Sequence, residues 1–505
     1  MGGAVLLIRQ KQFSYLALLG HKRFMKMLRL NDILVKMCKL SPWADSCVIY
    51  QHLGRGDRGA TRCRLGHPVG AAFALLIAAL SVPAFAKTAE VSEARLRADV
   101  AKLVSFGTRH TLSSQSDRTR GIGAARRWAE AEMRHISKAC GNCLTIALPE
   151  YMASGERIPQ PVRIVDVVAI QRGTERPNEV VIVQGHIDSR VSEVMDALKD
   201  APGANDDASG VAVVLEAARM LSRHPHPSTI VYAVLSGEEQ GLFGGKLLAN
   251  YAKAQGWTVK AVLNNDIVGN SRGSDGLIDD GHVRVFSEGP RADADDKLRL
   301  SARRFGGEND SPSRSLSRFI AGLKDQPLEV RQVWRADRMG RGGDHLPFQE
   351  LGYPAVRFSV AVENYDHQHQ DVRTANGTVF GDSIEFMDFP YLAKVTRLNI
   401  AALEGLAAAP MPPASTAEAA VQTFTDVKWS AVPGAATYSV WRRRTDAPGW
   451  EDKPVIADVV ATSARLEGVR GDDWIFGVSS TAASGAESPI SAAVPGGAFA
   501  PLVGP

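Results

Sequence analysis

The hydrophobic residues of this 505-residue chain follow two patterns, which change near residue 410. Between residues 180 and 266, three short and unbroken apolar runs rich in β-branched side chains surround a helical pattern. Runs of this kind are typical of strands that are buried on both faces. Their alternation with a helix predicts an α/β domain with a largely parallel sheet. The predicted strands are 180–183, 229–235 and 259–263, and the helix ends near residue 223.

The same reasoning extends the α/β pattern on both sides of this stretch. Apolar residues at helical spacing predict four helices, and short β-branched runs predict further strands. The predicted helices are 92–106, 121–136, 291–305 and 383–406, and the predicted strands are 144–148, 162–170 and 355–360. We therefore expect one α/β domain from residue 87 to residue 408.

A different pattern follows residue 408. Pro410, Pro412 and Pro413 lie among alanines, which predicts a linker at 409–415. Beyond it come short alternating strands separated by turn residues, at 427–430, 437–442 and 473–479. This pattern predicts a small all-β sandwich over residues 416–495.

The N-terminal region has the composition of a secretory signal. A basic segment with four arginines from residue 55 to 64 is followed by an apolar stretch at 69–82 and by Ala84-Phe85-Ala86. Basic, apolar and small-residue segments in that order are typical of a signal peptide. We predict a signal peptide at 55–86, a translation start that excludes residues 1–54, and export to the periplasm or outside the cell. The apolar stretch is too short for a comfortable membrane span, so cleavage is favoured over an uncleaved anchor. After cleavage, no stable membrane insertion is expected.

Composition and charge limit the classes of function that the chain can have. Hydrophobic residues make up 45% of the chain and charged residues 23%, which is ordinary for a globular protein. The net charge of +4 is mild, and no basic block carries interleaved aromatic residues, so a nucleic-acid partner is not expected. Of the five cysteines, Cys140 and Cys143 alone follow residue 86, and in an exported chain they predict a small local disulfide.

Carboxylates and histidines follow the predicted strands. His186 and Asp188 come after the first, Glu238 and Glu239 after the second, and Asp266 after the third. Two further positions are Asp206 before the helix and His367 after strand 355–360. In open α/β sheets ligands bind outside the carboxyl ends of the strands, so these side chains are expected to meet.

Such a set has the composition of a two-metal hydrolytic site. Two metal ions about 3.5–4 Å apart can activate a water and polarise a carbonyl, and imidazole and carboxylate are zinc ligands. With Asp206 as the bridge, His186 and Asp266 would hold one metal and Glu239 and His367 the other. Three carboxylates would offset three of the four charges on two Zn²⁺, and a shared hydroxide would offset the last.

Two neighbouring carboxylates suit other roles. Asp188 can point to the same side as His186 and orient its imidazole, and Glu238 can face the water as general base. Simpler interpretations remain open, because a single Asp-Asp before a helix is commonly a cap and Glu-Glu is commonly a solvated pair. By residue type alone, His369 is as good a ligand as His367.

Five ordered motifs resemble metallopeptidase family twenty-eight, which includes secreted bacterial leucyl aminopeptidases. They are Gly185-His186-Ile187-Asp188, Pro202-Gly203-Ala204-Asn205-Asp206-Asp207-Ala208-Ser209-Gly210, Ser236-Gly237-Glu238-Glu239-Gln240-Gly241-Leu242, Asn265-Asp266 and His367-x-x-x-Asp371. The resemblance implies a mixed central sheet between helices and two zinc ions held by the ligands above. It also implies Glu238 as base and Asp188 as orienter, and it selects His367 over His369. The region 425–491 resembles a fibronectin type III module in Trp429, Pro433-Gly434-Ala435, Tyr438-Ser439-Val440 and Trp474-Ile475-Phe476-Gly477-Val478.

The sequence thus predicts an exported zinc aminopeptidase that removes N-terminal residues from peptides with a free N-terminus. The nucleophile would be the metal-bridging hydroxide, with Glu238 as the base. Glutaminyl cyclisation on one zinc and carboxypeptidase action are the alternatives, and a receptor-like protein without activity is disfavoured because no site residue is missing. The C-terminal module is a candidate for contact with a surface or a polymer.

Overall fold

The computed structural model describes residues 90–502. The predicted signal peptide at 55–86 and the preceding segment lie outside the described residues. Within residues 90–502, no helix is both long and apolar enough to cross a membrane.

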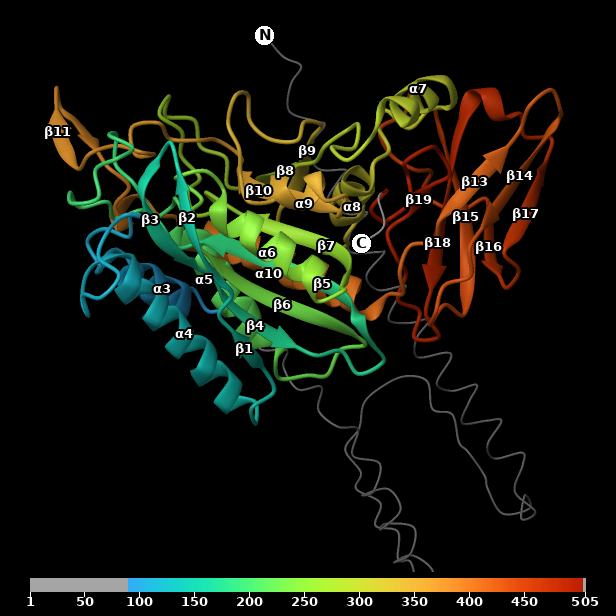
Figure 1. Cartoon of the computed structure of the whole chain (residues 1–505). Helices are drawn as coiled ribbons and strands as arrows, with labels where there is room; N and C mark the ends of the chain where they lie inside the picture. Colours follow the sequence, from blue (N-terminus) through green and yellow to red (C-terminus); the bar gives the residue numbers. More distant parts are fainter. Residues whose placement is uncertain (1–89, 503–505) are drawn as a thin grey trace, which may run out of the picture. The chain divides into compact units, whose positions relative to one another are not determined.

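An eight-stranded mixed sheet forms the centre of the α/β domain, in the order β1-β4-β6-β5-β7-β10-β8-β9 (Figure 1). Its four middle strands β6, β5, β7 and β10 are mutually parallel, and β4 and β8 run antiparallel beside them. The strands are β1 (Thr145–Ala147), β4 (Val167–Gln171), β5 (Arg176–His186), β6 (Ser228–Leu235), β7 (Thr258–Asn265), β8 (His282–Phe286), β9 (Glu329–Val333) and β10 (Ala355–Val360). The predicted fold class is confirmed.

Helices cover both faces of this sheet. On one face lie α3 (Glu93–Val104), α4 (Gly121–Ala139), α5 (Ala208–Leu221) and α10 (Phe389–Ala408), and on the other α6 (Phe243–Ala254) and α9 (Leu346–Glu350). In strand β5 the run 180–183 is apolar at every position, because Val181 and Val183 enter the core under the first set of helices and Val180 and Ile182 enter the second core. Burial on both faces removes the alternation expected of a half-buried strand.

Two boundaries differ from the sequence-based prediction. The predicted strand 162–170 is two strands, β3 (Ile158–Val165) and β4, because Asp166 leaves the ladder and accepts a hydrogen bond from the N–H of Ser236. Helix α10 begins at Phe389 rather than near 383, because the Asp388 carboxylate caps it by accepting from the N–H of Tyr391. The segment before it is the 3₁₀ turn η2 (Ile384–Phe386).

The sequence pattern missed several elements outside the central sheet. They are α6, α8 (Pro312–Ala321), β2 (Glu150–Gly155), β11 (Arg373–Ala375) and β12 (Thr378–Phe380), whereas α7 (Asp296–Phe305) lies inside the predicted helix 291–305. The predicted disulfide joins Cys140 and Cys143 just after α4, with their Cα atoms 5.6 Å apart.

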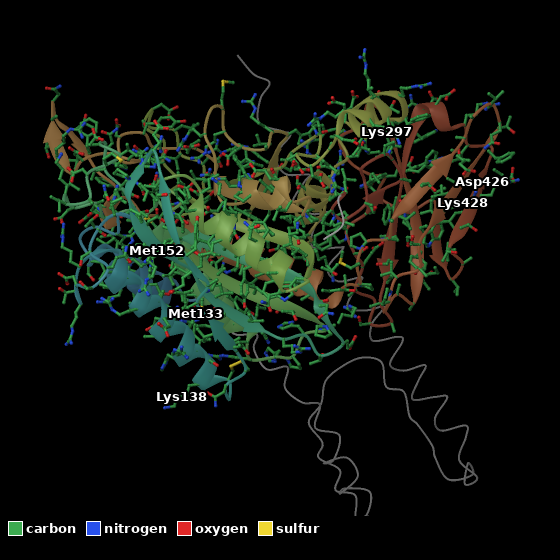
Figure 2. All side chains as sticks on the ribbon, viewed as in Figure 1. Met133, Lys138, Met152, Lys297, Asp426 and Lys428 are labelled. Atoms are coloured by element: carbon green, nitrogen blue, oxygen red, sulfur yellow. A yellow bond between two sulfur atoms is a disulfide. The ribbon has the colours of Figure 1, made fainter. Side chains whose placement is uncertain are left out.

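The C-terminal region is a sandwich of two antiparallel sheets with its own hydrophobic core. One sheet has the order β13-β14-β17 and the other β16-β15-β18-β19. Along β14, Val427 and Trp429 point into the core, and Asp426 and Lys428 point outward (Figure 2). The strands are β13 (Ser415–Glu418), β14 (Phe424–Trp429), β15 (Thr437–Arg444), β16 (Ile456–Val459), β17 (Ser463–Glu467), β18 (Trp474–Thr481) and β19 (Ser491–Ala492). The predicted all-β sandwich is confirmed.

The segment that joins the two regions is fixed in place. Pro410, Pro412 and Pro413 are buried. Immediately before them, the carbonyl of Ala409 accepts hydrogen bonds from Lys260 Nζ at 2.6 Å and from Arg176 Nη2 at 3.2 Å. The predicted linker is therefore a packed connection.

A buried ionic cluster also joins the regions. The Asp310 carboxylate before α8 pairs with Arg318 at 3.1 Å and with Arg443 of β15 at 2.6 Å. All three side chains are 3–4% exposed. We expect Asp310→Ala to lower the free energy of unfolding by about 3–5 kcal/mol, because it leaves two buried guanidinium groups without their counter-charge. Denaturant unfolding measures the change.

The matched control is Asp426→Ala, which removes an ion pair with Arg465 on the surface. A solvent-exposed pair contributes only about 0–1 kcal/mol. Equal effects of the two substitutions would contradict the structural role of the Asp310 cluster.

Burial of Glu288 predicts a pH-dependent stability. Its side chain accepts a hydrogen bond from the N–H of Ala292, and burial raises the pKa of Glu288 to about 8. The folded protein therefore keeps this proton over a pH range in which the unfolded chain has lost it. Stability from this group should fall as pH rises from about 4.5 to about 8. Unfolding measurements from pH 5 to 9 should show a flatter profile for Glu288→Gln. The exposed Glu329→Gln is the control, and unchanged slopes in Glu288→Gln would refute the prediction.

Candidate metal centre

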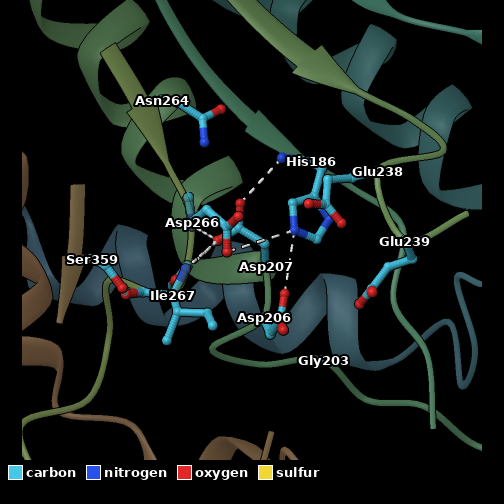
Figure 3. Close-up of polar contacts among 12 residues, drawn as sticks. His186, Gly203, Asp206, Asp207, Glu238, Glu239, Asn264, Asp266, Ile267 and Ser359 are labelled. Carbon is cyan, nitrogen blue, oxygen red and sulfur yellow. Dashed lines mark hydrogen bonds and ion pairs between the residues drawn. The ribbon is translucent and has the colours of Figure 1, made fainter. Parts of the chain in front are cut away.

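The carboxyl ends of the parallel strands bring four of the five predicted ligands together, His186, Asp206, Glu239 and Asp266 (Figure 3). His186 is the last residue of β5, Asp266 directly follows β7, and Glu238 and Glu239 lie in the turn after β6. Close packing holds this end of the sheet against the start of α5, since a Cβ on Gly185 would lie 2.7 Å from the backbone of Gly210. Glycine is therefore required at position 185, where the end of β5 packs directly on the backbone of α5.

Metal-ligating side chains form two groups within the described residues. In each group, one donor atom per residue lies within 4.8 Å of the others. The first group is His186, Glu238 and Asp266, and the second is Asp206, Glu239 and His369. The first contains the predicted partners His186 and Asp266.

Asp206 lies between the groups. Its Oδ1 is 3.2 Å from Nε2 of His186, and its Oδ2 is 2.9 Å from Nε2 of His369. Each oxygen of one carboxylate therefore faces a different imidazole. This is the arrangement expected of a carboxylate that bridges two metal ions, as predicted for Asp206.

The position predicted for His367 is occupied by His369. Nε2 of His369 lies 3.2 Å from Oε1 of Glu239 as well as beside Asp206. The ring of His367 instead stacks on Phe386, with centroids 3.7 Å apart. His369 has φ near 52°, in the left-handed region, and this local turn of the chain accompanies the placement of His369 at the centre. The spacing to Asp371 predicted His367, whereas the structure places His369 beside Asp206 and Glu239.

Asp188 organises the turn that carries the two glutamates. Its carboxylate accepts hydrogen bonds from the backbone N–H groups of Gly237, Glu238 and Glu239. Nδ1 of His186 lies 3.1 Å from the carbonyl oxygen of Asp188 and 3.6 Å from its carboxylate. Asp188 thus contacts His186 as predicted, with the backbone carbonyl closer than the carboxylate.

The two residues of the Asp-Asp pair before α5 make different contacts. Asp206 faces the two imidazoles, and Asp207 caps α5 by accepting from the N–H of Gly210 at 2.9 Å. The Asp207 carboxylate also accepts from the N–H of His186. The cap and the ligand interpretations therefore each describe one member of the pair.

Several charged residues around the centre were not predicted. Arg109 is fully buried and donates hydrogen bonds to carbonyls on both ligand loops, at Ile187 and Gly203. The carboxylate of Asp382 accepts from the backbone N–H of Asp206 at 2.7 Å. Isolated charges in loops give no pattern that would identify these contacts.

Two more arginines contact the ligands directly. Arg190 Nε lies 2.9 Å from Glu239, and its Nη2 lies 2.6 Å from Nδ1 of His369. Arg357 Nη2 lies 2.7 Å from Asp266. Arg357 could have been identified from the sequence, because it is the one charged residue in the largely apolar predicted strand 355–360.

The residues present suit divalent cations. Glu239 Oε1 is buried and accepts no hydrogen bond from residues 90–502, although Nε2 of His369 lies 3.2 Å away. Burial raises the pKa of Glu238 and of Asp207 well above the usual range, and repulsion from neighbouring carboxylates, Asp266 among them, adds to both shifts. Burial also raises the pKa of Asp266 to about 6. Cations beside these oxygens would offset this repulsion, and imidazole with carboxylate is a zinc donor set.

A sequence model of peptidase family M28 matches residues 166–381, the segment that contains every residue of the two groups. A protein of the fungus Leptosphaeria maculans, described as a probable zinc metalloprotease, is 44% identical over 415 residues, which are 81% of this chain and 96% of that protein. The chain belongs to peptidase family M28. The family resemblance of the five motifs is confirmed.

Solved structures similar to this M28 chain include an aminopeptidase and a glutaminyl cyclase. The Legionella pneumophila LapA aminopeptidase has a TM-score of 0.44 and 17% identity, with 62% of this chain and 71% of that chain covered. A Porphyromonas gingivalis glutaminyl cyclase has a TM-score of 0.43 and 17% identity, with 62% and 99% covered. These similarities do not discriminate between the two reactions.

Proposed function

We propose that this protein is a dizinc aminopeptidase that hydrolyses the N-terminal peptide bond of peptides with a free N-terminus. The observation that carries the proposal is Asp206, whose two carboxylate oxygens face two separate groups of ligands. His186 and Asp266 would hold one zinc, and Glu239 and His369 the other, with Asp206 between them. A single-zinc cyclase has no need of the second complete group.

Zinc bound there would polarise the carbonyl of the scissile bond and lower the pKa of a water. Glu238 is placed to act as general base, because it lies beside His186 and Asp266 while its neighbour Glu239 turns to the other group. Its carboxylate would take the proton of the attacking water and give it to the departing amine. Asp188 holds Glu238 in place through the backbone of the turn.

A panel of peptides tests this function. One peptide sequence with a free N-terminus, with a blocked N-terminus and with a blocked C-terminus is incubated with the purified protein, and zinc per chain is measured. We expect two zinc ions, release of the N-terminal residue from every peptide with a free N-terminus, and loss of activity in a chelator. Cyclisation of N-terminal glutamine with one zinc would identify a glutaminyl cyclase. Cleavage that requires a free C-terminus would identify a carboxypeptidase.

We also propose that the enzyme is exported, because the residues before Lys87 have the order of a signal peptide. A mature N-terminus at Lys87, measured by mass spectrometry of the secreted protein, would support this. A peptide from residues before Arg55 would contradict the proposed start.

The C-terminal sandwich is proposed to be a fibronectin type III-like module. Its three-stranded and four-stranded antiparallel sheets support this proposal. Contact with a surface or a polymer would be its role. The full chain should then sediment with an insoluble polysaccharide, and a failure to bind any of a panel of such polymers would count against this role.

A further inference from the structure

His367 remains without a role once His369 occupies the metal centre. One ring nitrogen of His367, Nδ1, is buried and has no hydrogen-bond partner among the described residues. The ring is held flat against Phe386, with 17° between the ring planes. A buried polar atom without a partner is costly unless a ligand or a water satisfies it.

A groove of about 480 Å³ opens beside His367. It is lined by Asn270, Asn364, His367, Phe386 and Ile278, among others, and its outer rim carries exposed residues of α3 and α10. This volume lies in the range of sites that enclose small ligands, about 300–1,000 Å³. The groove is therefore large enough for part of a peptide.

A small cavity beside Asp206 shares part of its wall with this groove. The cavity is about 10 Å³ and is lined by Asp206 together with four residues that also line the groove. These shared residues are Asn270, Asn364, His367 and Phe386. A cavity of this size holds about one water and no side chain. His367 and Phe386 therefore line both the groove and the cavity that reaches Asp206.

The wall of the groove and the metal centre are held by one segment. Phe386 ends the turn η2, and Asp382, four residues earlier, accepts the backbone N–H of Asp206 and that of Asn205. The distance from the bridging carboxylate to the stacked rings is therefore fixed by a short, hydrogen-bonded stretch of chain. Fixed spacing is what a site needs to place a substrate relative to its reacting atoms.

We propose that this groove binds the residues of a peptide substrate that follow the scissile bond, and that His367 is a substrate-binding residue that hydrogen-bonds the peptide backbone at the inner end. The inference rests on the proposed aminopeptidase function. An exopeptidase that removes the first residue needs an open path for the remaining chain, and this groove ends among exposed residues. The substrate class is accordingly oligopeptides longer than dipeptides.

The test compares kinetics and zinc content in variants of the full chain, with a dipeptide and a tetrapeptide that share the same N-terminal residue. His367→Ala should raise KM for the tetrapeptide about tenfold, the effect of one hydrogen bond, while both zinc ions stay bound. His367→Gln, which keeps a hydrogen-bonding group, should recover part of the loss. Ile278→Trp, which fills the groove, should raise KM for the tetrapeptide about tenfold more than for the dipeptide. The exposed His135→Ala is the control and should match the wild type.

The outcomes separate the two proposals. Loss of zinc in His367→Ala, or an unchanged KM in that variant, would overturn the role of His367. Equal effects of Ile278→Trp on the KM of both peptides would overturn the proposal that the groove binds the peptide. If the wild type cleaves only peptides with a free C-terminus, the aminopeptidase function fails, and the zinc content and KM of the same variants on those peptides still test His367.

Discussion

Glu238→Gln is expected to lower kcat by about 10²–10⁴ while both zinc ions stay bound, because a positioned general base contributes a factor of this size. Glutamine keeps the shape of the side chain and cannot accept the proton of the attacking water. Proton transfer takes place in the transition state, so the loss should fall on kcat and leave KM nearly unchanged. Steady-state kinetics and metal analysis of the same preparation measure both quantities.

Glu239→Ala is the matched comparison, because the two glutamates are neighbours in one turn. Glu239 belongs to the group with Asp206 and His369, so its removal should lower zinc content and activity together. Added zinc should restore part of the activity of Glu239→Ala and none of that of Glu238→Gln. Zinc loss in Glu238→Gln with full zinc in Glu239→Ala would exchange the two roles.

His369→Ala is expected to lose one of the two zinc ions and most of the activity. The imidazole of His369 contacts both Asp206 and Glu239, and its removal leaves that zinc with carboxylate ligands only. Zinc per chain should fall from about two to about one, measured after dialysis against a weak chelator. The surface variant His135→Ala should keep two zinc ions and wild-type activity.

The result for His369 bears directly on the choice between two histidines. If His369→Ala retains two zinc ions and His367→Ala loses one, the spacing to Asp371 identifies the ligand and the geometry described above does not apply to the zinc-bound enzyme. Loss of zinc in both variants would require both imidazoles at the centre.

The sequence by itself determined the α/β class, the small β sandwich and most of the candidate metal centre. Four of the five predicted ligands are in the two groups of the structure, His186, Asp206, Glu239 and Asp266. The physical reason is local, because strands buried on both faces are uninterrupted apolar runs and their carboxyl ends in a parallel sheet share one edge. Any polar residue directly after such a run is therefore placed without knowledge of the rest of the chain.

Only the tertiary structure decided which histidine lies beside Asp206 and Glu239. His367 and His369 lie in a long loop after β10, where no periodic pattern fixes which side chain points inward. The left-handed backbone of His369 and the stack of His367 on Phe386 make that choice. The same holds for Asp207, which became a helix cap because its neighbour Asp206 faces the imidazoles.

The tertiary structure also decided what surrounds the centre and what joins the two regions. Asp382 reaches the N–H of Asp206 from 176 residues away, and Arg443 pairs with Asp310 across 133 residues. The buried charge of Arg357 is explained by two distant carboxylates, Asp266 just after β7 and Asp337. Such contacts depend on how distant segments pack, since a charge in an unpatterned loop looks the same in sequence whether it is solvated or buried against a partner.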